Sequence, residues 1–200
     1  MSSTLAVRLA VAALSLTGAS VATAQATAPA APSFEIRVPG GQFIGTGAQR
    51  DQLKDAQTTA AQLSWLLRPH LALTGTFSWA RSRDIAVADA PKLDVFTTDI
   101  GLEARTTELR SSERVALRGF AGFGGGARSY NYRKLDAAAT HNLAGYAAIG
   151  GEARMGRVGL RLEARDYATG FKPLVGAGKS STRNDVVIMA AITLNRRAAR

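Results

Sequence analysis

Long stretches of alternating apolar and polar residues are the feature that most restricts what this chain can fold into. Between Val158 and Arg165 every second residue is apolar, and Arg161, Glu163 and Arg165 lie between them. Successive side chains of a strand point to opposite faces, so this pattern predicts a sheet with one apolar and one charged surface. In a soluble sandwich the charged face would meet water, whereas in a membrane barrel the apolar face meets lipid and the charged face fills the interior.

Eight segments of the chain have the strand pattern. The first predicted strand has an alternative in which it continues past Gly40-Gly41 to Ile44. Several reach the roughly 9–11 residues that a tilted strand needs to cross a bilayer, whereas ordinary strands are nearer about 5–6 residues. The predicted strands are Phe34–Val38, Thr59–Arg68, Leu71–Arg81, Leu93–Arg105, Arg114–Tyr130, Asn142–Arg154, Arg157–Ala168 and Asp185–Asn195.

Short and long connections alternate between these strands. The shorter ones are Pro69-His70, Met155-Gly156 and Thr106–Glu113, and the longer ones are Pro39–Thr58, Ser82–Lys92, Asn131–His141 and Thr169–Asn184. An up-and-down barrel with both termini at one rim produces this sorting, and outer-membrane barrels have short periplasmic turns and long extracellular loops. We therefore predict an all-β, eight-stranded antiparallel transmembrane β-barrel over residues 34–196.

Aromatic residues fall near both predicted rims. Trp79 and Phe96 flank the long Ser82–Lys92 connection, and Phe34 and Trp65 fall near the opposite rim. Aromatic girdles at both membrane interfaces are typical of such barrels. The alternative is a sandwich whose core holds aromatic residues near its strand ends.

The N-terminal segment predicts export. Arg8 precedes the apolar run Leu9–Leu16, and Ala22-Thr23-Ala24 is a small-residue cleavage site, so we expect a cleaved signal peptide over residues 1–24. Residues 25–33 read as a linker and residues 197–200 as a basic tail. The chain has no cysteine and a net charge of +10, but its basic residues are dispersed rather than concentrated, which argues against a nucleic-acid partner.

Charged residues of both signs are predicted to point into the barrel. Eight strands leave an interior that side chains can fill, so these charges are expected to form a paired polar core. The glycine-rich run Gly122–Gly126 lacks the Gly-Lys-Ser/Thr that a phosphate-binding loop needs, and is expected to permit close approach within a strand. With two histidines, no metal site is expected, and no cofactor. The predicted interior charges are Asp99, Glu103, Arg105, Arg118, Glu152, Arg154, Arg161, Glu163 and Arg165.

The chain resembles the small outer-membrane β-barrel proteins of Gram-negative bacteria, of the OmpA/OmpX/OmpW kind. The resemblance rests on the signal peptide, the eight alternating segments, the sorted loops and the strand-turn-strand run from Gly150 to Tyr167. It implies a non-enzymatic, porin-like protein of the outer membrane, with membrane lipid, lipopolysaccharide and the assembly machinery as partners. Such barrels usually end in an aromatic residue, whereas this last strand ends Ile192-Thr193-Leu194-Asn195.

The predicted role is structural or interfacial at the cell envelope, and passage of small hydrophobic compounds is left open. The small-molecule ligand, if any, is unknown. Basic residues of the long connections are candidates for pairing with lipopolysaccharide phosphates: Arg50, Lys54, Arg81, Arg83, Lys92, Arg133, Lys134, Lys172, Lys179 and Arg183.

Two other classes of function remain open. Ser129 and His141 are expected to face each other near the outer rim, as the nucleophile and base of a lipid-modifying hydrolase would, with Asp136 as the available carboxylate. A soluble periplasmic β-barrel or sandwich binding protein is the other alternative, and it requires the apolar faces to point inward.

Overall fold

The computed structural model describes residues 34–107, 110–111, 115–133, 139–155, 158–171 and 181–194. The expected signal peptide, linker and basic tail lie outside these residues, as do Lys134, Asp136, Lys172 and Lys179 of the long connections. Within the described residues, no helix combines the length and apolar character required to cross a membrane.

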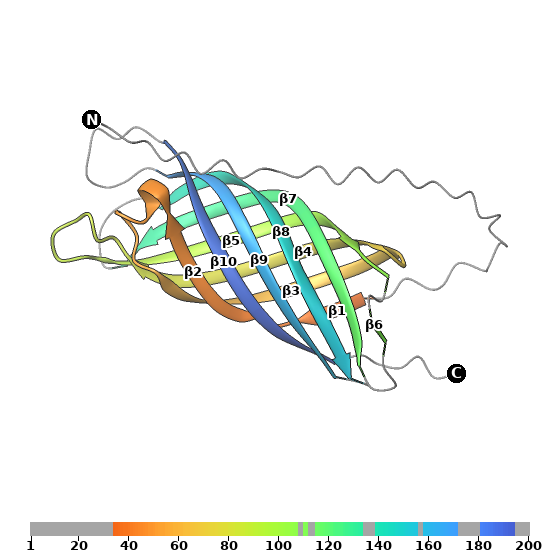
Figure 1. The fold of residues 1–200 in the computed structure, drawn as a ribbon. Coiled ribbons are helices and arrows are strands. Elements are labelled where there is room, and N and C mark those ends of the chain that lie inside the picture. Colours follow the sequence, from red (N-terminus) through yellow and green to blue (C-terminus); the bar gives the residue numbers. More distant parts are fainter. Residues whose placement is uncertain are drawn as a thin grey trace, which may run out of the picture. The chain divides into compact units, whose positions relative to one another are not determined.

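Long antiparallel strands dominate the fold (Figure 1), accompanied by one short 3-10 helix at Gly47–Gln49. Most strands extend beyond their predicted limits, because pairing with neighbours continues past the clearest alternation. The strands are β1 (Phe34–Arg37), β2 (Gly40–Thr46), β3 (Ala56–Arg68), β4 (Leu71–Arg83), β5 (Lys92–Arg105), β6 (Arg110–Ser111), β7 (Ala116–Tyr132), β8 (Thr140–Met155), β9 (Val158–Phe171) and β10 (Ser181–Leu194).

The first barrel strand consists of two pieces, β1 and β2, so the continuation past Gly40-Gly41 is present. Both pieces pair with β3 in one register, with Ile36 opposite Leu63 and Gly40 opposite Thr59. Pro39 separates them, since a proline cannot donate a ladder hydrogen bond, although its carbonyl still accepts from the Ala60 amide at 2.8 Å.

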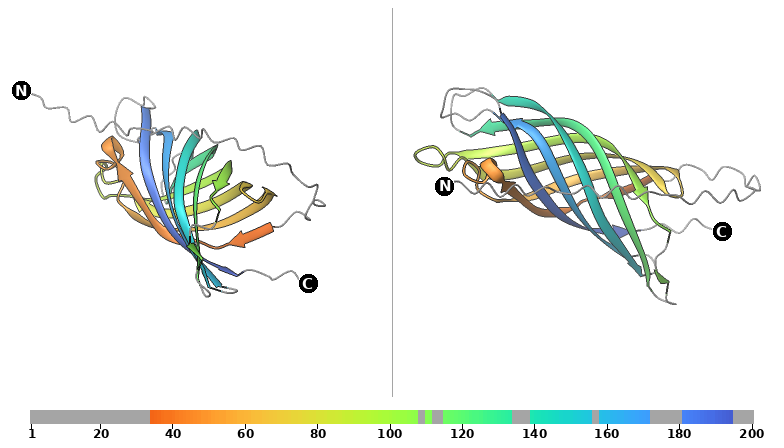
Figure 2. Two further views of the ribbon diagram at one scale, coloured as in Figure 1. Left: turned by 45° about the vertical axis from the view of Figure 1, so that its right-hand side comes forward. Right: turned by 45° about the horizontal axis from the view of Figure 1, so that its top comes forward.

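Pairing continues around the sheet until it closes. From β3 the order runs through β4, β5, β7, β8 and β9 to β10, and β10 pairs with β2. Since β1 and β2 together occupy one position, and β6 pairs only with the start of β7, the barrel has eight strand positions. The predicted eight-stranded antiparallel barrel is thereby confirmed, and Figures 1 and 2 show its strands running obliquely around the wall.

The oblique course of the strands can be followed in the register. The row of directly paired residues around the barrel reads Thr46, Asn184, Ala168, Gly145, Gly125, Ile100, Gly75, Leu63 and Ile36. Ile36 belongs to the same strand position as Thr46 but lies ten residues earlier in the chain (46 against 36). Such a stagger is what lets tilted strands close into a cylinder.

The two rims of the barrel differ in their connections. The short-turn rim carries Pro69-His70 and the β8–β9 and β5–β7 connections, and both barrel ends lie there, since Phe34 pairs with Trp65 and Leu194 with Val158. The long-loop rim carries the other four connections. The predicted sorting of short and long connections onto opposite rims is therefore present.

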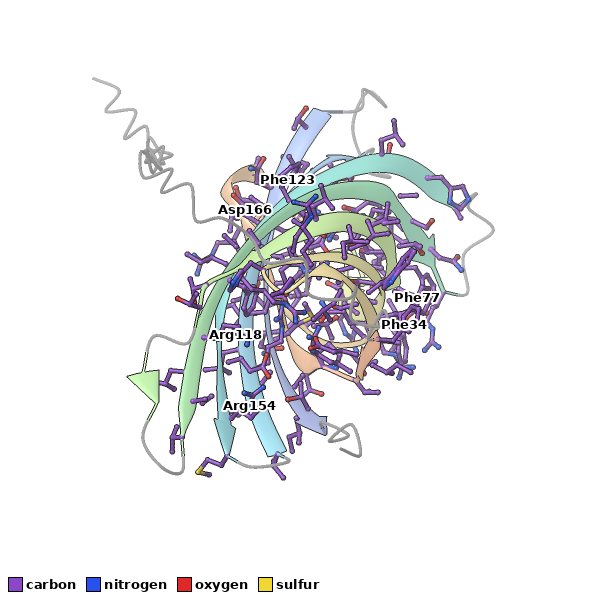
Figure 3. The ribbon with its side chains drawn as sticks, turned by 90° about the vertical axis from the view of Figure 1, so that its right-hand side faces the viewer. Phe34, Phe77, Arg118, Phe123, Arg154 and Asp166 are labelled. Carbon is purple, nitrogen blue, oxygen red and sulfur yellow. The ribbon has the colours of Figure 1, made fainter. Side chains whose placement is uncertain are left out.

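The outer face of the barrel is largely apolar. Figure 3 shows Phe34, Phe77 and Phe123 on the outside of the sheet. Every barrel strand position contributes an exposed apolar side chain to this belt, which includes Ile36, Leu63, Phe77, Ile100, Phe123, Ile149, Leu162 and Ile188. Because the sheet closes on itself into a barrel, the predicted sandwich alternative is wrong.

Candidate functional site

The lumen of the barrel holds an unbroken chain of alternating charges. Arg105 contacts Glu35 at 2.8 Å and Glu103 at 2.7 Å, and Arg161 contacts Glu103 at 2.5 Å and Glu163 at 2.8 Å. In order, this ion-pair chain consists of Arg37, Glu35, Arg105, Glu103, Arg161, Glu163, Arg165 and Asp99.

Three strands that are not neighbours supply the ion-pair chain. Glu35 and Arg37 come from β1, while β5 and β9 supply the rest. Residues two apart on a strand share a face, which places Arg105 beside Glu103 and Arg161 beside Glu163. The contacts from Arg105 to Glu35 and from Arg161 to Glu103 join different strands across the lumen. The ion-pair chain therefore ties opposite walls together.

The charges of the ion-pair chain balance, with four carboxylates against four guanidinium groups. All are buried except Glu35, whose side chain is 26% exposed. Burying charge is costly unless partners satisfy it, and neutral groups complete the network. Gln62 accepts from Arg37 at 2.9 Å, Thr76 accepts from Arg165 at 3.0 Å, and Tyr167 donates to Asp99 at 2.8 Å.

Aromatic rings cover the guanidinium planes. Arg161 lies 3.4 Å from the ring centroid of Phe120, and Arg165 lies 4.5 Å from that of Tyr146. These contacts add attraction between each cation and a ring face. Together with the hydrogen bonds they fill the middle and the short-turn half of the lumen with side chains.

Glycines make room for these rings. A side chain on Gly124 would overlap the ring of Tyr146 and the carbonyl of Ile100, and one on Gly101 would overlap the Tyr146 hydroxyl. The glycine-rich run of β7 thus provides close approach, and no phosphate-binding loop is formed there because the run lies within a strand.

The long-loop half of the lumen is filled differently. Arg128 pairs with Asp185 and lies over the rings of Phe43 and Tyr167, at 5.8 and 4.3 Å from their centroids. Around this single ion pair is an apolar and aromatic cluster, which includes Phe43, Leu53, Leu93, Val95, Tyr130, Tyr132 and Val187. We refer to it as the apolar plug.

Six of the nine predicted interior charges belong to the ion-pair chain: Asp99, Glu103, Arg105, Arg161, Glu163 and Arg165. Arg118, Glu152 and Arg154 share the inward face but lie half-exposed at the short-turn end of β7 and β8, where they line a small recess. Arg118 and Arg154 are labelled there in Figure 3.

Sequence reasoning missed several charged residues that the barrel pairs, including Glu35, Arg37, Arg128 and Asp185. The signal for the first two was present, because Glu35 and Arg37 alternate with Phe34, Ile36 and Val38. Only the cross-lumen contacts distinguish them from solvated residues of a strand end.

The four predicted girdle residues lie in two pairs. Phe34 stacks on Trp65 near the short-turn rim, with ring centroids 5.9 Å apart. Trp79 pairs across the sheet with Phe96 nearer the long-loop rim, and its indole donates to Asp94 at 3.1 Å. An aromatic body with a polar tip of this kind suits a boundary between apolar and aqueous surroundings.

Ser129 and His141 face each other across β7 and β8. The Ser129 hydroxyl lies 2.6 Å from His141 Nδ1, and both residues are near the long-loop rim. Asp136, the predicted third member, lies outside the described residues. Among the residues that the structure does describe, no group of three or more His, Asp or Glu is placed to hold a metal ion.

Fold and lumen together define a class, the small eight-stranded up-and-down barrel with an apolar exterior and an ion-paired interior. The solved structure of Neisserial surface protein A is similar to this chain with a TM-score of 0.58 and 7% identity, over 83% of this chain and 100% of that one. The expected resemblance to small outer-membrane barrels is confirmed at the level of the fold.

Two further solved structures are similar at lower scores. The N-terminal barrel domain of Pseudomonas aeruginosa OprF has a TM-score of 0.44 and 9% identity, over 79% of this chain and 96% of that one. Yersinia pestis Ail, in complex with the heparin analogue sucrose octasulfate, has a TM-score of 0.42 and 13% identity, over 81% and 96%. No family model matches the chain, and no curated protein sequence matches it.

Proposed function

We propose that this chain is a non-enzymatic outer-membrane β-barrel with a structural or envelope-interface role. The observation that carries the proposal is the inverted distribution of polarity: apolar side chains cover the outside of every strand position, and ion pairs fill the inside. Lipid is the solvent that suits such an apolar surface. A closed barrel can also lie in lipid because all of its backbone groups are hydrogen-bonded within its own wall.

The filled lumen supports a structural role over that of an open pore. The ion-pair chain and the apolar plug occupy the space that a wide channel would need. Lipid is the main partner in this proposal, the long loops face outward, and the assembly machinery inserts the barrel after the signal peptide is removed. Passage of small hydrophobic compounds would require a path outside the filled lumen.

The first experiment is fractionation of cells that express the full chain, followed by gel migration of boiled and unboiled samples. We expect the protein in the outer-membrane fraction, with a shift in migration on heating. Recovery in the soluble periplasmic fraction without a heat shift would refute the proposal.

A matched pair of substitutions tests lipid contact directly. Ile149 is exposed on β8, and Ile85 is exposed in the β4–β5 connection. Ile149→Arg should destabilise the barrel in lipid vesicles by about 2–4 kcal/mol, the cost of arginine on a lipid-facing wall near the bilayer midplane. Ile85→Arg should change the unfolding free energy by less than about 0.5 kcal/mol. Equal, small effects in urea titrations would mean that water covers both sites.

A second candidate function rests on the hydrogen bond between Ser129 and His141. A serine activated by a histidine on the outer face could attack an ester of a membrane lipid. The test is release of fatty acid from phospholipid vesicles and from lipopolysaccharide by the purified barrel. Activity that Ser129→Ala abolishes, in a variant that keeps its heat shift, would establish this function and displace the structural one.

A further inference from the structure

The outer wall has a recess at the long-loop rim, over β3, β4 and β5. Its volume is about 620 Å³, and its lining includes Lys54, Asp55, Trp79, Arg81, Arg83 and Lys92. We call it the rim cavity. It opens on the outside of the barrel and is separate from the ion-pair chain, whose residues face the lumen.

Positive charge dominates the rim cavity, with four basic side chains against the one carboxylate of Asp55. Asp55 is itself engaged, since it accepts from the Gly45 amide at 3.2 Å. Arg81 approaches Asp94 at 3.8 Å. Among the described residues, Lys54, Arg83 and Lys92 form no ion pair with a carboxylate, so their charges are available to an anion.

The position of Lys54 is held by the fold, although it lies in a connection. Its amide donates to the Arg83 carbonyl at 3.0 Å, and the neighbouring residue Leu53 is buried and forms a bridge with Asp84. The amide of Ile85 donates to the Gln52 carbonyl at 2.7 Å, which adds a second backbone hydrogen bond between the two segments. The backbone that carries Lys54 is thus fastened to β4 beside Arg83, which reduces the entropy lost on binding.

The outward face of β4 changes character in steps below the rim. Arg83 and Arg81 come first, Trp79 follows with the Arg81 guanidinium 4.7 Å from its ring centroid, and Phe77 lies next and stacks on Phe96. From the rim toward the middle of the wall, charged residues are followed by an amphipathic aromatic residue and then by apolar aromatic residues, which is the order found at a membrane interface. An amphiphile at this wall would place its anionic group among the basic residues and its acyl chains over Phe77.

We propose that the rim cavity binds the phosphate of a phosphorylated glycolipid of the outer leaflet. Arginine and lysine bind phosphate oxygens by charge-assisted hydrogen bonds. The cavity offers several donors and a volume that holds a sugar phosphate as well as the phosphate itself. This inference rests on the proposed location in the outer membrane and names the partner of the long-loop rim.

Tryptophan fluorescence supplies a local reporter, because the chain has two tryptophans and Trp65 lies at the opposite rim. The full chain carrying Trp65→Phe is folded in non-ionic detergent and titrated with a diphosphorylated disaccharide glycolipid. The same glycolipid without phosphates and phosphatidylglycerol are titrated in parallel. We expect saturable change in Trp79 emission with the diphosphorylated glycolipid, at concentrations at least about tenfold lower than with either comparison lipid.

Arg83→Gln in this background should weaken the response to the diphosphorylated glycolipid by about tenfold, the equivalent of one charge-assisted hydrogen bond. Arg50→Gln is the control, since Arg50 is an exposed base of the same rim outside the cavity. Equal responses to all three lipids, an equal response to phosphatidylglycerol alone, or equal losses in the two variants would each overturn the inference. The heat shift separates these outcomes from failure of the proposed function, because it reports the barrel and not the lipid.

Discussion

The two halves of the lumen are both filled with side chains but are held together by different forces. Toward the short-turn rim, eight charged side chains from three strands form one continuous series of ion pairs. Toward the long-loop rim, a single pair of Arg128 and Asp185 is surrounded by the apolar plug. The outer face of the barrel does not differ in this way, because exposed apolar residues lie over both halves.

The comparison teaches that one interior can combine a cooperative network with additive packing. In the ion-pair chain each inner residue has two partners, so removal of one leaves two neighbours with one partner each and leaves one charge of the chain unbalanced. In the apolar plug each side chain contributes through its own contacts, and neighbours relax in part when one is truncated. The two halves should therefore respond differently to single substitutions.

The largest effect is expected at the middle of the ion-pair chain. Glu103→Ala leaves both Arg105 and Arg161 without one of their carboxylates. Uncompensated buried charge costs about 3–5 kcal/mol, so the free energy of unfolding in lipid vesicles should fall by that amount. Urea titration followed by the heat shift measures it. A loss below about 1 kcal/mol would mean that water enters the lumen and solvates the arginines.

Truncation in the apolar plug should cost less and act locally. Leu93→Ala removes a fully buried side chain and leaves a cavity, for an expected loss of about 2–4 kcal/mol. Combined with Glu103→Ala, the two losses should add to within about 0.5 kcal/mol, because the sites share no partner. Strong non-additivity in the double variant would show that the two halves unfold as one network.

The edge of the ion-pair chain should tolerate change better than its middle. Thr76→Val keeps the shape of the side chain but removes the acceptor of one Arg165 hydrogen bond. A loss of about 1–2 kcal/mol is expected, since Arg165 keeps both of its carboxylate partners. Ser78→Ala, on the same strand and face, serves as the control for polar-to-apolar change. A loss as large as that of Glu103→Ala would contradict the assignment of Thr76 to the edge.

The smallest effect is expected when the isolated pair is replaced as a unit. Arg128→Met with Asp185→Leu exchanges an ion pair for apolar side chains that suit the surrounding plug. Such joint replacements are often neutral, so a change within about 1 kcal/mol is expected. Asp185→Leu alone should be far worse, because it leaves Arg128 buried and uncompensated. If the joint variant were as unstable as the single one, the pair would be part of a larger network.

Sequence alternation predicted the barrel and most of its ion-pair chain. Residues an even number of positions apart on a strand share a face. This rule places six charges inside a closed sheet that has an apolar exterior: Asp99, Glu103 and Arg105 on one strand, and Arg161, Glu163 and Arg165 on another. Parity could not tell that Arg118, Glu152 and Arg154 lie at a rim, since it gives the face of a residue but not its height in the barrel. Height depends on the register, which shifts by ten residues around the wall (46 against 36).

Local sequence was therefore enough to predict most of the inward-facing charges, the number of strands and which connections are short. These properties follow from the two-residue period of a strand and from the spacing of turns. Only the tertiary structure decided that Glu35 meets Arg105, that Arg128 meets Asp185 and that Lys54 lies beside Arg83. Each of these contacts joins segments far apart in the chain, and their positions depend on the tilt and closure of the whole sheet, which no single strand encodes.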